Sequence, residues 1–288
     1  MCDTAAVHAD PKVAVVGHVE WVKFARVSHI PSAGEIVHAE DPFEEPAGGG
    51  AVAAVQLARL AGNAVLITAL GKDEHGRRSV ERLGELGVEV WAASREQPTR
   101  TATTLVDDAR ERTITTFGER LEPTLEDSEI PWDRLAEMDA VYFTAGDAGA
   151  MRAARAARVL VSSPRALDAL GHGVSLDALV LSAEDAVERE EATRAEQDAK
   201  LIVLTDGGHG GTYQKRDGGS GKWPAAELPG EARDSYGCGD SFAAGLTYGL
   251  GSGLQVPDAL TLAARCGATC LTGRGPYERQ LSAAELRQ

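Results

Sequence analysis

Residues 234–240 read DSYGCGD and lead directly into the small-residue run SFAAGL at residues 241–246. Gly237 and Gly239 permit backbone conformations closed to residues with a Cβ, so successive N–H groups can converge on an anion where a helix begins. Asp240 stands at or beside the N-cap, where its carboxylate could take a proton from a hydroxyl that attacks a bound phosphate. The alternative is a tight turn in which Asp240 only caps the helix.

Upstream of this loop, apolar β-branched segments alternate with helical patterns. Core strands are expected at residues 12–17, 64–70, 88–92, 140–144, 158–162, 179–181 and 201–205. Helices are expected at residues 51–61 and 77–86, and Ala-, Arg- and Glu-rich helical stretches separate the later strands. This alternation predicts an α/β protein with a central, mostly parallel sheet that helices cover on both faces.

Two strand-rich segments interrupt the alternation. Residues 22–27 and 35–39 are semi-alternating runs that favour exposed strands, and residues 101–106 and 113–117 flank a polar turn and predict an antiparallel hairpin. We therefore expect a small β lid built from about residues 20–45 and 100–118, within a single domain over residues 1–288. The acidic run at residues 184–198 favours a solvated helix face.

Composition excludes several classes of protein. The 288 residues are 43% hydrophobic, 25% charged and 5% aromatic, which rules out a disordered or fibrous chain. The net charge of −15 would repel a phosphate backbone at long range, so no nucleic-acid partner is expected. A small anionic ligand remains compatible with this charge, because backbone amides at a helix N-terminus can make a local positive site.

The cysteines and the N-terminus bear on location. Cys2, Cys238, Cys266 and Cys270 are too few and too clustered for a disulfide framework, so a reducing cytoplasm is expected. Residues 1–11 lack a basic stretch followed by an apolar one, which argues against a secretion signal. No run approaches about 18 apolar residues, so no membrane span is expected.

The DSYGCGD stretch resembles, at all seven positions, the second signature of the ribokinase or phosphofructokinase-B family of sugar kinases, Asp-Thr/Ser-x-Gly-Ala/Cys-Gly-Asp. Other stretches resemble family motifs in the family's order: residues 12–17, 31–35, 48–50, 205–211 and 263–275. The resemblance covers nearly the whole chain. It implies a ribokinase-like fold with a β lid over the acceptor site.

The same resemblance implies a reaction and the residues that carry it. The γ-phosphoryl group of ATP would move to a substrate hydroxyl in the presence of Mg²⁺, with Asp240 as base. The amides of Gly237, Cys238 and Gly239 would stabilise the transferring group. The nucleotide would lie along residues that come from four parts of the chain, namely Asp234, Thr205, Gly207, Gly210, Ala268 and Gly275. The Asp234 loop is also a candidate site for a monovalent cation, as in some relatives.

The acceptor side departs from the family pattern. The positions that would contact the acceptor are Glu20, Val22, Gly48, Gly49, Ala53 and Asp240. Val22 replaces a family aspartate, for which Glu20 could substitute from two residues away, and Ala53 replaces a family asparagine. These changes, with Trp21 as a stacking surface, favour a nucleoside or other ring-bearing alcohol, although Trp21 could equally pack under the lid.

The metal motif also differs. The family's Asn-x-x-Glu aligns with residues 182–185, SAED, which leaves Glu184 or Asp185 as a displaced carboxylate for indirect Mg²⁺ contact. The alternative is a helix N-terminus made of a serine followed by acids.

We therefore expect an ATP-dependent kinase for a small carbohydrate or nucleoside. The alternative is a nucleotide- or metabolite-binding protein that keeps the fold but has weakened catalysis. Some relatives pair through their lids, which favours a homodimer. The roles of two side chains stay open. Arg112 could reach the acceptor from the lid or be solvated. Cys238 could be a reactive thiol or a packed one.

Overall fold

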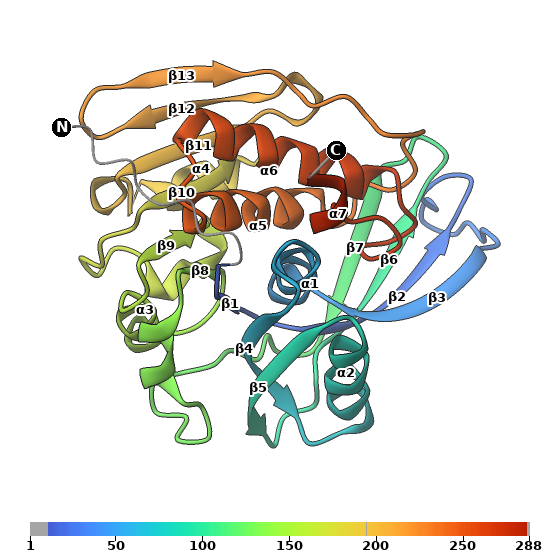
Figure 1. The fold of residues 1–288 in the computed structure, drawn as a ribbon. Coiled ribbons are helices and arrows are strands. Elements are labelled where there is room, and N and C mark those ends of the chain that lie inside the picture. Colours follow the sequence, from blue (N-terminus) through green and yellow to red (C-terminus); the bar gives the residue numbers. More distant parts are fainter. Residues whose placement is uncertain (1–10, 194, 287–288) are drawn as a thin grey trace.

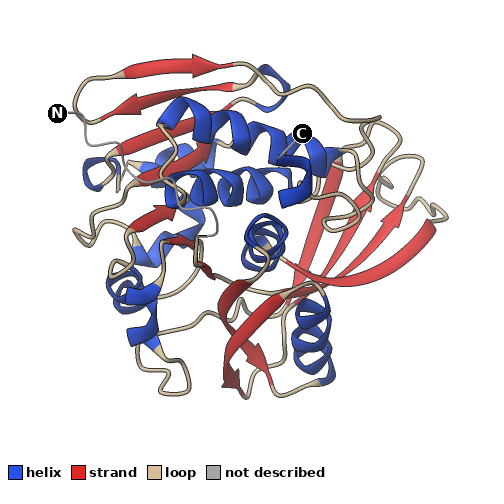
Figure 2. Cartoon of the chain, viewed as in Figure 1, coloured by secondary structure: helices blue, strands red, loops and turns tan. Residues whose placement is uncertain are grey.

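The computed structural model describes residues 11–193 and 195–286, which form two β-sheets with helices around the larger one (Figures 1 and 2). The larger sheet has nine strands in the order β13-β12-β11-β10-β9-β8-β1-β4-β5. Its strands are β1 (Val13–Val16), β4 (Ala64–Gly71), β5 (Val88–Arg95), β8 (Ala140–Phe143), β9 (Val159–Ser162), β10 (Ala178–Ser182), β11 (Leu201–Thr205), β12 (Gly211–Lys215) and β13 (Ser220–Trp223). From β5 to β11 all neighbours pair in parallel, and β12 and β13 add an antiparallel edge.

The strand order shows where the direction of sheet building reverses, which is at β1, between β4 and β8. From β1 the chain first builds β4 and β5 on one side and then returns to build β8 to β11 on the other. Ligands of open α/β sheets bind outside the carboxyl ends of the strands, at the point where the order reverses. The fold therefore directs attention to the loops that follow β1 and β8.

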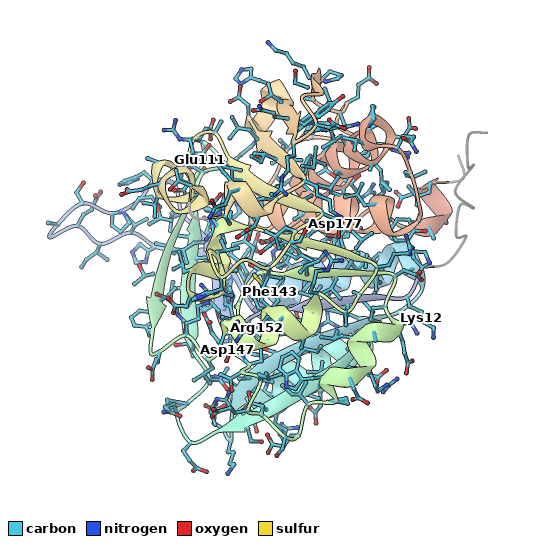
Figure 3. The ribbon with its side chains drawn as sticks, turned by 90° about the vertical axis from the view of Figure 1, so that its left-hand side faces the viewer. Lys12, Glu111, Phe143, Asp147, Arg152 and Asp177 are labelled. Atoms are coloured by element: carbon cyan, nitrogen blue, oxygen red, sulfur yellow. The ribbon has the colours of Figure 1, made fainter. Side chains whose placement is uncertain are left out.

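Two layers of helices cover the larger sheet. Val13 and Val15 face the layer with α1 (Gly49–Ala61), α2 (Glu74–Glu85), α5 (Cys238–Gly251), α6 (Val256–Leu271) and α7 (Ala283–Leu286). Ala14 and Val16 face the layer with α3 (Ala148–Ala154) and α4 (Ala186–Ala192). Phe143 lies in the interior above α3, which carries Arg152 (Figure 3). Strands such as β4, AVLITALG, are apolar on both faces because both faces are covered.

The described residues also contain short 3-10 helices, at Trp132–Glu137, Pro164–Ala169, Glu196–Asp198 and Gly207–His209. The acidic run therefore forms two short helices rather than one long one. No helix in the described ranges is long and apolar enough to cross a membrane.

The second sheet has four strands in the order β3-β2-β6-β7, and Figure 1 shows it beside α1 and the C-terminal helices. Its strands are β2 (Glu20–Arg26), β3 (Glu40–Ala47), β6 (Thr101–Val106) and β7 (Arg112–Phe117). The central pair, β2 and β6, is parallel, and the outer pairs are antiparallel. We call this four-stranded sheet the lid.

The strand expected at residues 35–39 is wrong, because β3 begins only at Glu40. The Glu35 N–H donates to the Ser32 carbonyl, and the Glu35 carboxylate accepts the Ser32 N–H and contacts the His29 ring. These bonds stabilise a local turn. Ile36 is 86% exposed and finds no apolar surface to cover, so nothing draws this segment into the sheet.

Candidate active site

The candidate active site lies at the carboxyl ends of the central strands. His18 follows β1, Thr144 follows β8, and Arg165 lies in the short helix after β9. The start of α1 packs against Gly17 and His18 and against Asp240 in the first turn of α5. The lid reaches this region through Glu20 of β2 and Arg112 of β7. Residues far apart in the sequence are thereby brought to one end of the sheet.

The conformation of the DSYGCGD loop is fixed by hydrogen bonds to its first residue, Asp234. Asp234 is buried, and its two carboxylate oxygens accept the N–H groups of Tyr236 and Gly275, each at 2.9 Å. Helix α5 begins at Cys238, and its N-cap is Gly237 with a φ of 81°, a conformation that favours glycine. No side chain caps α5, and the Cys238 N–H makes only a long bond of 3.4 Å to the Ser235 carbonyl, so the first turn of the helix keeps donors for an anion. Because Gly237 is the N-cap, Asp240 does not cap this helix.

Asp240 lies against the start of α1. A Cβ placed on Gly49 would come within 2.9 Å of Asp240 Oδ1, so only a glycine leaves room for this carboxylate. The N-cap of α1, Gly48, has a φ of 87° and likewise makes no side-chain cap bond. The two glycine-containing stretches of the sequence therefore form one site, with two uncapped helix N-termini and one carboxylate between them.

Charges around Asp240 act in opposite directions. Burial raises the pKa of the Asp240 carboxyl above its ordinary value, whereas Arg165, His18 and Arg112 oppose that increase. The net shift is upward. A carboxylate whose pKa is raised toward the working pH is a better proton acceptor than a fully solvated one.

Glu20 reaches this site and Val22 does not. The Glu20 carboxylate lies 3.1 Å from the Nε2 of His18, and both side chains lie against Gly48. Val22 and Ala53 are fully buried in the apolar core, so their side chains do not reach the surface of the site. Gly48 N–H donates to the Tyr236 hydroxyl at 3.2 Å and links the acceptor side to the DSYGCGD loop.

Trp21 packs on the opposite side of β2 from Glu20. Its ring stacks on His75 of α2 with centroids 5.5 Å apart, and Arg78 lies over it at 4.3 Å. Its Nε1–H donates to Glu44 at 3.0 Å. Of the two interpretations of Trp21, packing under the lid is the one that the structure supports.

Four arginines surround the site, and the sequence identified only one of them. Arg112 donates to the Ser235 hydroxyl at 3.0 Å, so the lid hairpin contacts the DSYGCGD loop rather than solvent alone. Arg100 directly precedes β6, Arg120 lies in the segment after β7, and Arg165 follows β9. These three carry no local motif, because tertiary structure alone brings them together.

The acids proposed for magnesium have different surroundings. The Asp185 carboxylate accepts the N–H groups of Val187 and Glu188 at 3.0 and 3.1 Å, and so caps α4. Glu188 accepts the Ser182 N–H at 3.0 Å and pairs with Arg165 at 3.0 Å. Glu184 is exposed beside Gly207 in the loop after β11. The helix start made of a serine followed by acids is therefore present in the structure. Among the described residues, no hydrogen bond or ion pair engages the carboxylate of Glu184, which lies beside Gly207.

The residues assigned to the nucleotide lie at the end of β11, in the loop that follows it, on α6, in the loop after α6 and at the start of the DSYGCGD loop. Thr205 ends β11 and donates to the Leu181 carbonyl at 3.3 Å, and Gly207 is exposed in the following turn. Gly210 is packed closely against Trp223 and Pro224 at the end of β13. Ala268 is half-buried on α6, and Gly275 contacts the Phe43 ring of the lid.

The described cysteines are unpaired thiols. A hydrogen bond with Cys270 and burial hold the pKa of the Cys238 thiol well above its ordinary value. A raised pKa disfavours the thiolate, which is the nucleophilic form, so it supports the packed interpretation of Cys238. Cys2 lies outside the described residues.

Comparison with known proteins places this geometry in a family. The sequence model of the family described as pfkB family carbohydrate kinase matches residues 10–170 and 175–283 of this chain. The chain belongs to this family. It is a carbohydrate kinase.

Relatives agree with this assignment. An ATP-dependent ribose-1-phosphate kinase of Halopiger xanaduensis is 30% identical over 275 residues, which cover 89% of this chain and 90% of the relative. The ribokinase of Thermotoga maritima has a TM-score of 0.75 at 19% identity, over 96% of this chain and 98% of the other. The ribokinase of Arabidopsis thaliana, complexed with ribose and ATP, has a TM-score of 0.75 at 17% identity, over the same shares of the two chains. The expected ribokinase-like fold is confirmed.

Proposed function

We propose that this kinase transfers the γ-phosphoryl group of ATP directly to a hydroxyl of a small carbohydrate or nucleoside, with Asp240 as the base. The observation that carries this proposal is the contact between Asp240 and Gly49 at two helix N-termini that no side chain caps. A carboxylate so placed can take the proton of a hydroxyl bound beside Gly48 and Gly49, while the oxygen of that hydroxyl attacks phosphorus.

The amides of Gly237, Cys238 and Gly239 would hold the transferring group. Negative charge on its oxygens is favoured by the positive end of α5. Asp234 fixes the loop that leads into these amides, because it accepts the N–H groups of Tyr236 and Gly275. Arg112 and Arg165, which act electrostatically on Asp240, add positive charge next to this loop. No covalent intermediate on the enzyme is needed, because Asp240 acts on the proton and the acceptor oxygen acts on phosphorus.

The surroundings of Glu184 fit a role in binding magnesium. Mg²⁺ in kinases keeps several waters and is held by phosphates plus one or two carboxylates, so a cage of protein ligands is not required. Within the described residues, no group of three or more His, Cys, Asp or Glu side chains is placed to hold a metal. Glu184, beside Gly207, would contact the ion through water. The ion would supply charge neutralisation on the phosphates.

The acceptor would lie between Gly49, Glu20 and His18. Glu20 provides a carboxylate for sugar hydroxyls, which compensates for the apolar Val22 that is buried below it. The Halopiger relative is described as acting on ribose 1-phosphate, so a sugar phosphate belongs among the acceptors to test.

The proposal is tested by incubating the protein with ATP and Mg²⁺ and following ADP release over a panel of pentoses, hexoses, sugar phosphates and nucleosides. The proposal predicts that at least one acceptor stimulates ADP release and becomes phosphorylated. If no acceptor does so while ATP still raises the melting temperature, the chain is a binding protein on the same fold.

A further inference from the structure

Arg100 and Arg120 converge on the acceptor side of the site. Arg100 Nε lies 3.9 Å from Glu20 Oε2, beyond hydrogen-bonding distance, and is buried with no hydrogen-bond partner among the described residues. Arg100 donates from Nη2 to Thr116 Oγ1 at 2.6 Å. A guanidinium carries five N–H donors, so this side chain keeps donor capacity beside Glu20.

Arg120 approaches the same place from the opposite direction. Its Nη2 donates to the carbonyls of Thr144 and Arg165, both at 2.9 Å, which fixes the guanidinium at the carboxyl end of β8. Arg120 also acts electrostatically on both His18 and Glu20. Its Nε pairs with Glu122 Oε1 at 2.8 Å, and because the side chain is 21% exposed, the guanidinium can still be reached by a ligand.

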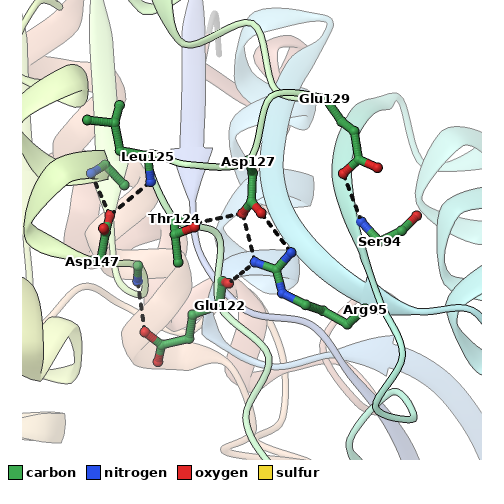
Figure 4. A network of polar contacts seen from close by, with 10 residues as sticks. Ser94, Arg95, Glu122, Thr124, Leu125, Asp127, Glu129 and Asp147 are labelled. Atoms are coloured by element: carbon green, nitrogen blue, oxygen red, sulfur yellow. Dashed lines mark hydrogen bonds and ion pairs between the residues drawn. The ribbon is translucent and has the colours of Figure 1, made fainter.

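A polar network holds the segment that carries Arg120 (Figure 4). Arg95, at the end of β5, pairs with both carboxylate oxygens of Asp127 at 2.7 Å and donates to the Glu122 carbonyl at 2.8 Å. Glu122 in turn accepts the Gly146 N–H at 3.1 Å through its side chain. Arg120 is thus held in position by its flanking residues, and its placement is a property of the fold.

The positive charges of this region repel one another. Burial lowers the pKa of the Arg120 guanidinium, and the charges of Arg100 and Arg165 lower it further, while Glu122 and Glu20 oppose the shift. Arg120 pairs with Glu122 at 2.8 Å and Arg165 pairs with Glu188 at 3.0 Å, whereas Arg100 has, among the described residues, only the longer contact with Glu20 at 3.9 Å. Charge compensation is therefore weakest at Arg100, where an added anion would be most favourable. The chain as a whole carries a net charge of −15, so this concentration of arginines is local.

We propose that Arg100 and Arg120 form an anion subsite for the acceptor, so that the preferred acceptor carries a phosphate or carboxylate in addition to the hydroxyl that is phosphorylated. This inference rests on the proposed function and deepens it. Arginine suits such a group because its planar fork binds phosphate or carboxylate oxygens in pairs. A neutral sugar or nucleoside would leave Arg100 Nε, which is buried without a hydrogen-bond partner among the described residues, with no acceptor.

Four acceptors that share a primary 5-hydroxyl test the proposal: ribose, ribose 1-phosphate, ribonate and inosine. We expect kcat/KM for ribose 1-phosphate or ribonate to exceed that for ribose and inosine by about 10- to 100-fold, the range of charge-assisted hydrogen bonds. Whichever of the two is preferred identifies the anion as a phosphate or a carboxylate. If ribose or inosine is used as efficiently as both anions, the subsite is refuted while the proposed function stands. If none of the four, and no other acceptor, is phosphorylated, the proposed function itself fails.

Variants assign the subsite to its residues. Arg100→Gln should reduce the preference for the anionic acceptor over ribose by about 10- to 100-fold, mainly through KM for the acceptor. Arg120→Lys keeps the charge but loses the fork, and should reduce the same preference where Arg120→Gln is too unstable to purify. Arg26→Gln, which removes an exposed arginine of the same sheet, is the matched control. An increase in KM for ATP with an unchanged acceptor preference would refute the proposal, because the arginines would then serve the nucleotide.

Discussion

The contact between Gly49 and Asp240 predicts that Gly49→Ala damages catalysis far more than stability. The new Cβ would lie 2.9 Å from Asp240 Oδ1, whereas ordinary contacts begin at 3.4 Å, so the carboxylate must retreat by about 0.5 Å. A displacement of 1 Å can cost about 100-fold in rate, so we expect kcat to fall by about 10- to 100-fold. The backbone tolerates alanine, because Gly49 is not among the glycines with positive φ.

Gly84→Ala on α2 is the matched control. No atom lies within 4 Å of its added Cβ, so this variant should gain about 0.5 to 1 kcal/mol of stability and keep the kcat of the wild type. The assay is ADP release at saturating ATP and acceptor, together with the melting temperature of each variant. A Gly49→Ala enzyme with wild-type kcat would refute the placement of Asp240 at the reacting atoms.

Three further predictions concern pH, the DSYGCGD loop and the lid. Because the raised pKa of Asp240 reflects an ionised form that folding disfavours, this cost is present above the ordinary carboxyl pKa and disappears at lower pH. Asp240→Asn should therefore raise the melting temperature at neutral pH. The gain should shrink as the pH falls through the raised pKa of Asp240 and should be absent below the ordinary carboxyl pKa. Wild-type kcat/KM should decline as Asp240 is protonated, and a stability gain independent of pH would contradict this. Gly237→Ala should cost about 2 to 3 kcal/mol of stability in a urea titration, since φ is 81° and the Cβ would lie 2.8 Å from Val52 Cγ1. Trp21→Ala should cost about 3 kcal/mol and leave KM for the acceptor unchanged, whereas an increased KM would place Trp21 at the acceptor.

The sequence predicts the larger sheet well because its signal is local. Each parallel strand is a short apolar run, and the glycines that open α1 and α5 stand next to those runs. The strand predicted at residues 35–39 was wrong because a local pattern is not sufficient by itself. The residues alternate in polarity, but no apolar surface lies opposite them in the fold.

The candidate site was only partly predictable. The seven residues from Asp234 to Asp240 carry a motif, so that loop could be found in one dimension. Arg100, Arg120 and Arg165 carry none, because they are spread over 65 positions of the sequence and two sheets must fold before they meet. Trp21 shows the converse. The sequence left both ligand contact and packing open for this residue, whereas the pleat of β2 directs its side chain toward α2.

A single-turnover measurement on Asp240→Asn tests the central claim most directly. The enzyme would be mixed with radiolabelled ATP, Mg²⁺ and its best acceptor, with ATP affinity measured separately by titration. Our account predicts that phosphoryl transfer is lost, by about 1,000-fold or more, while the Kd for ATP stays within a few-fold of the wild type. Retained transfer together with lost ATP binding would contradict the assignment of Asp240 as the base.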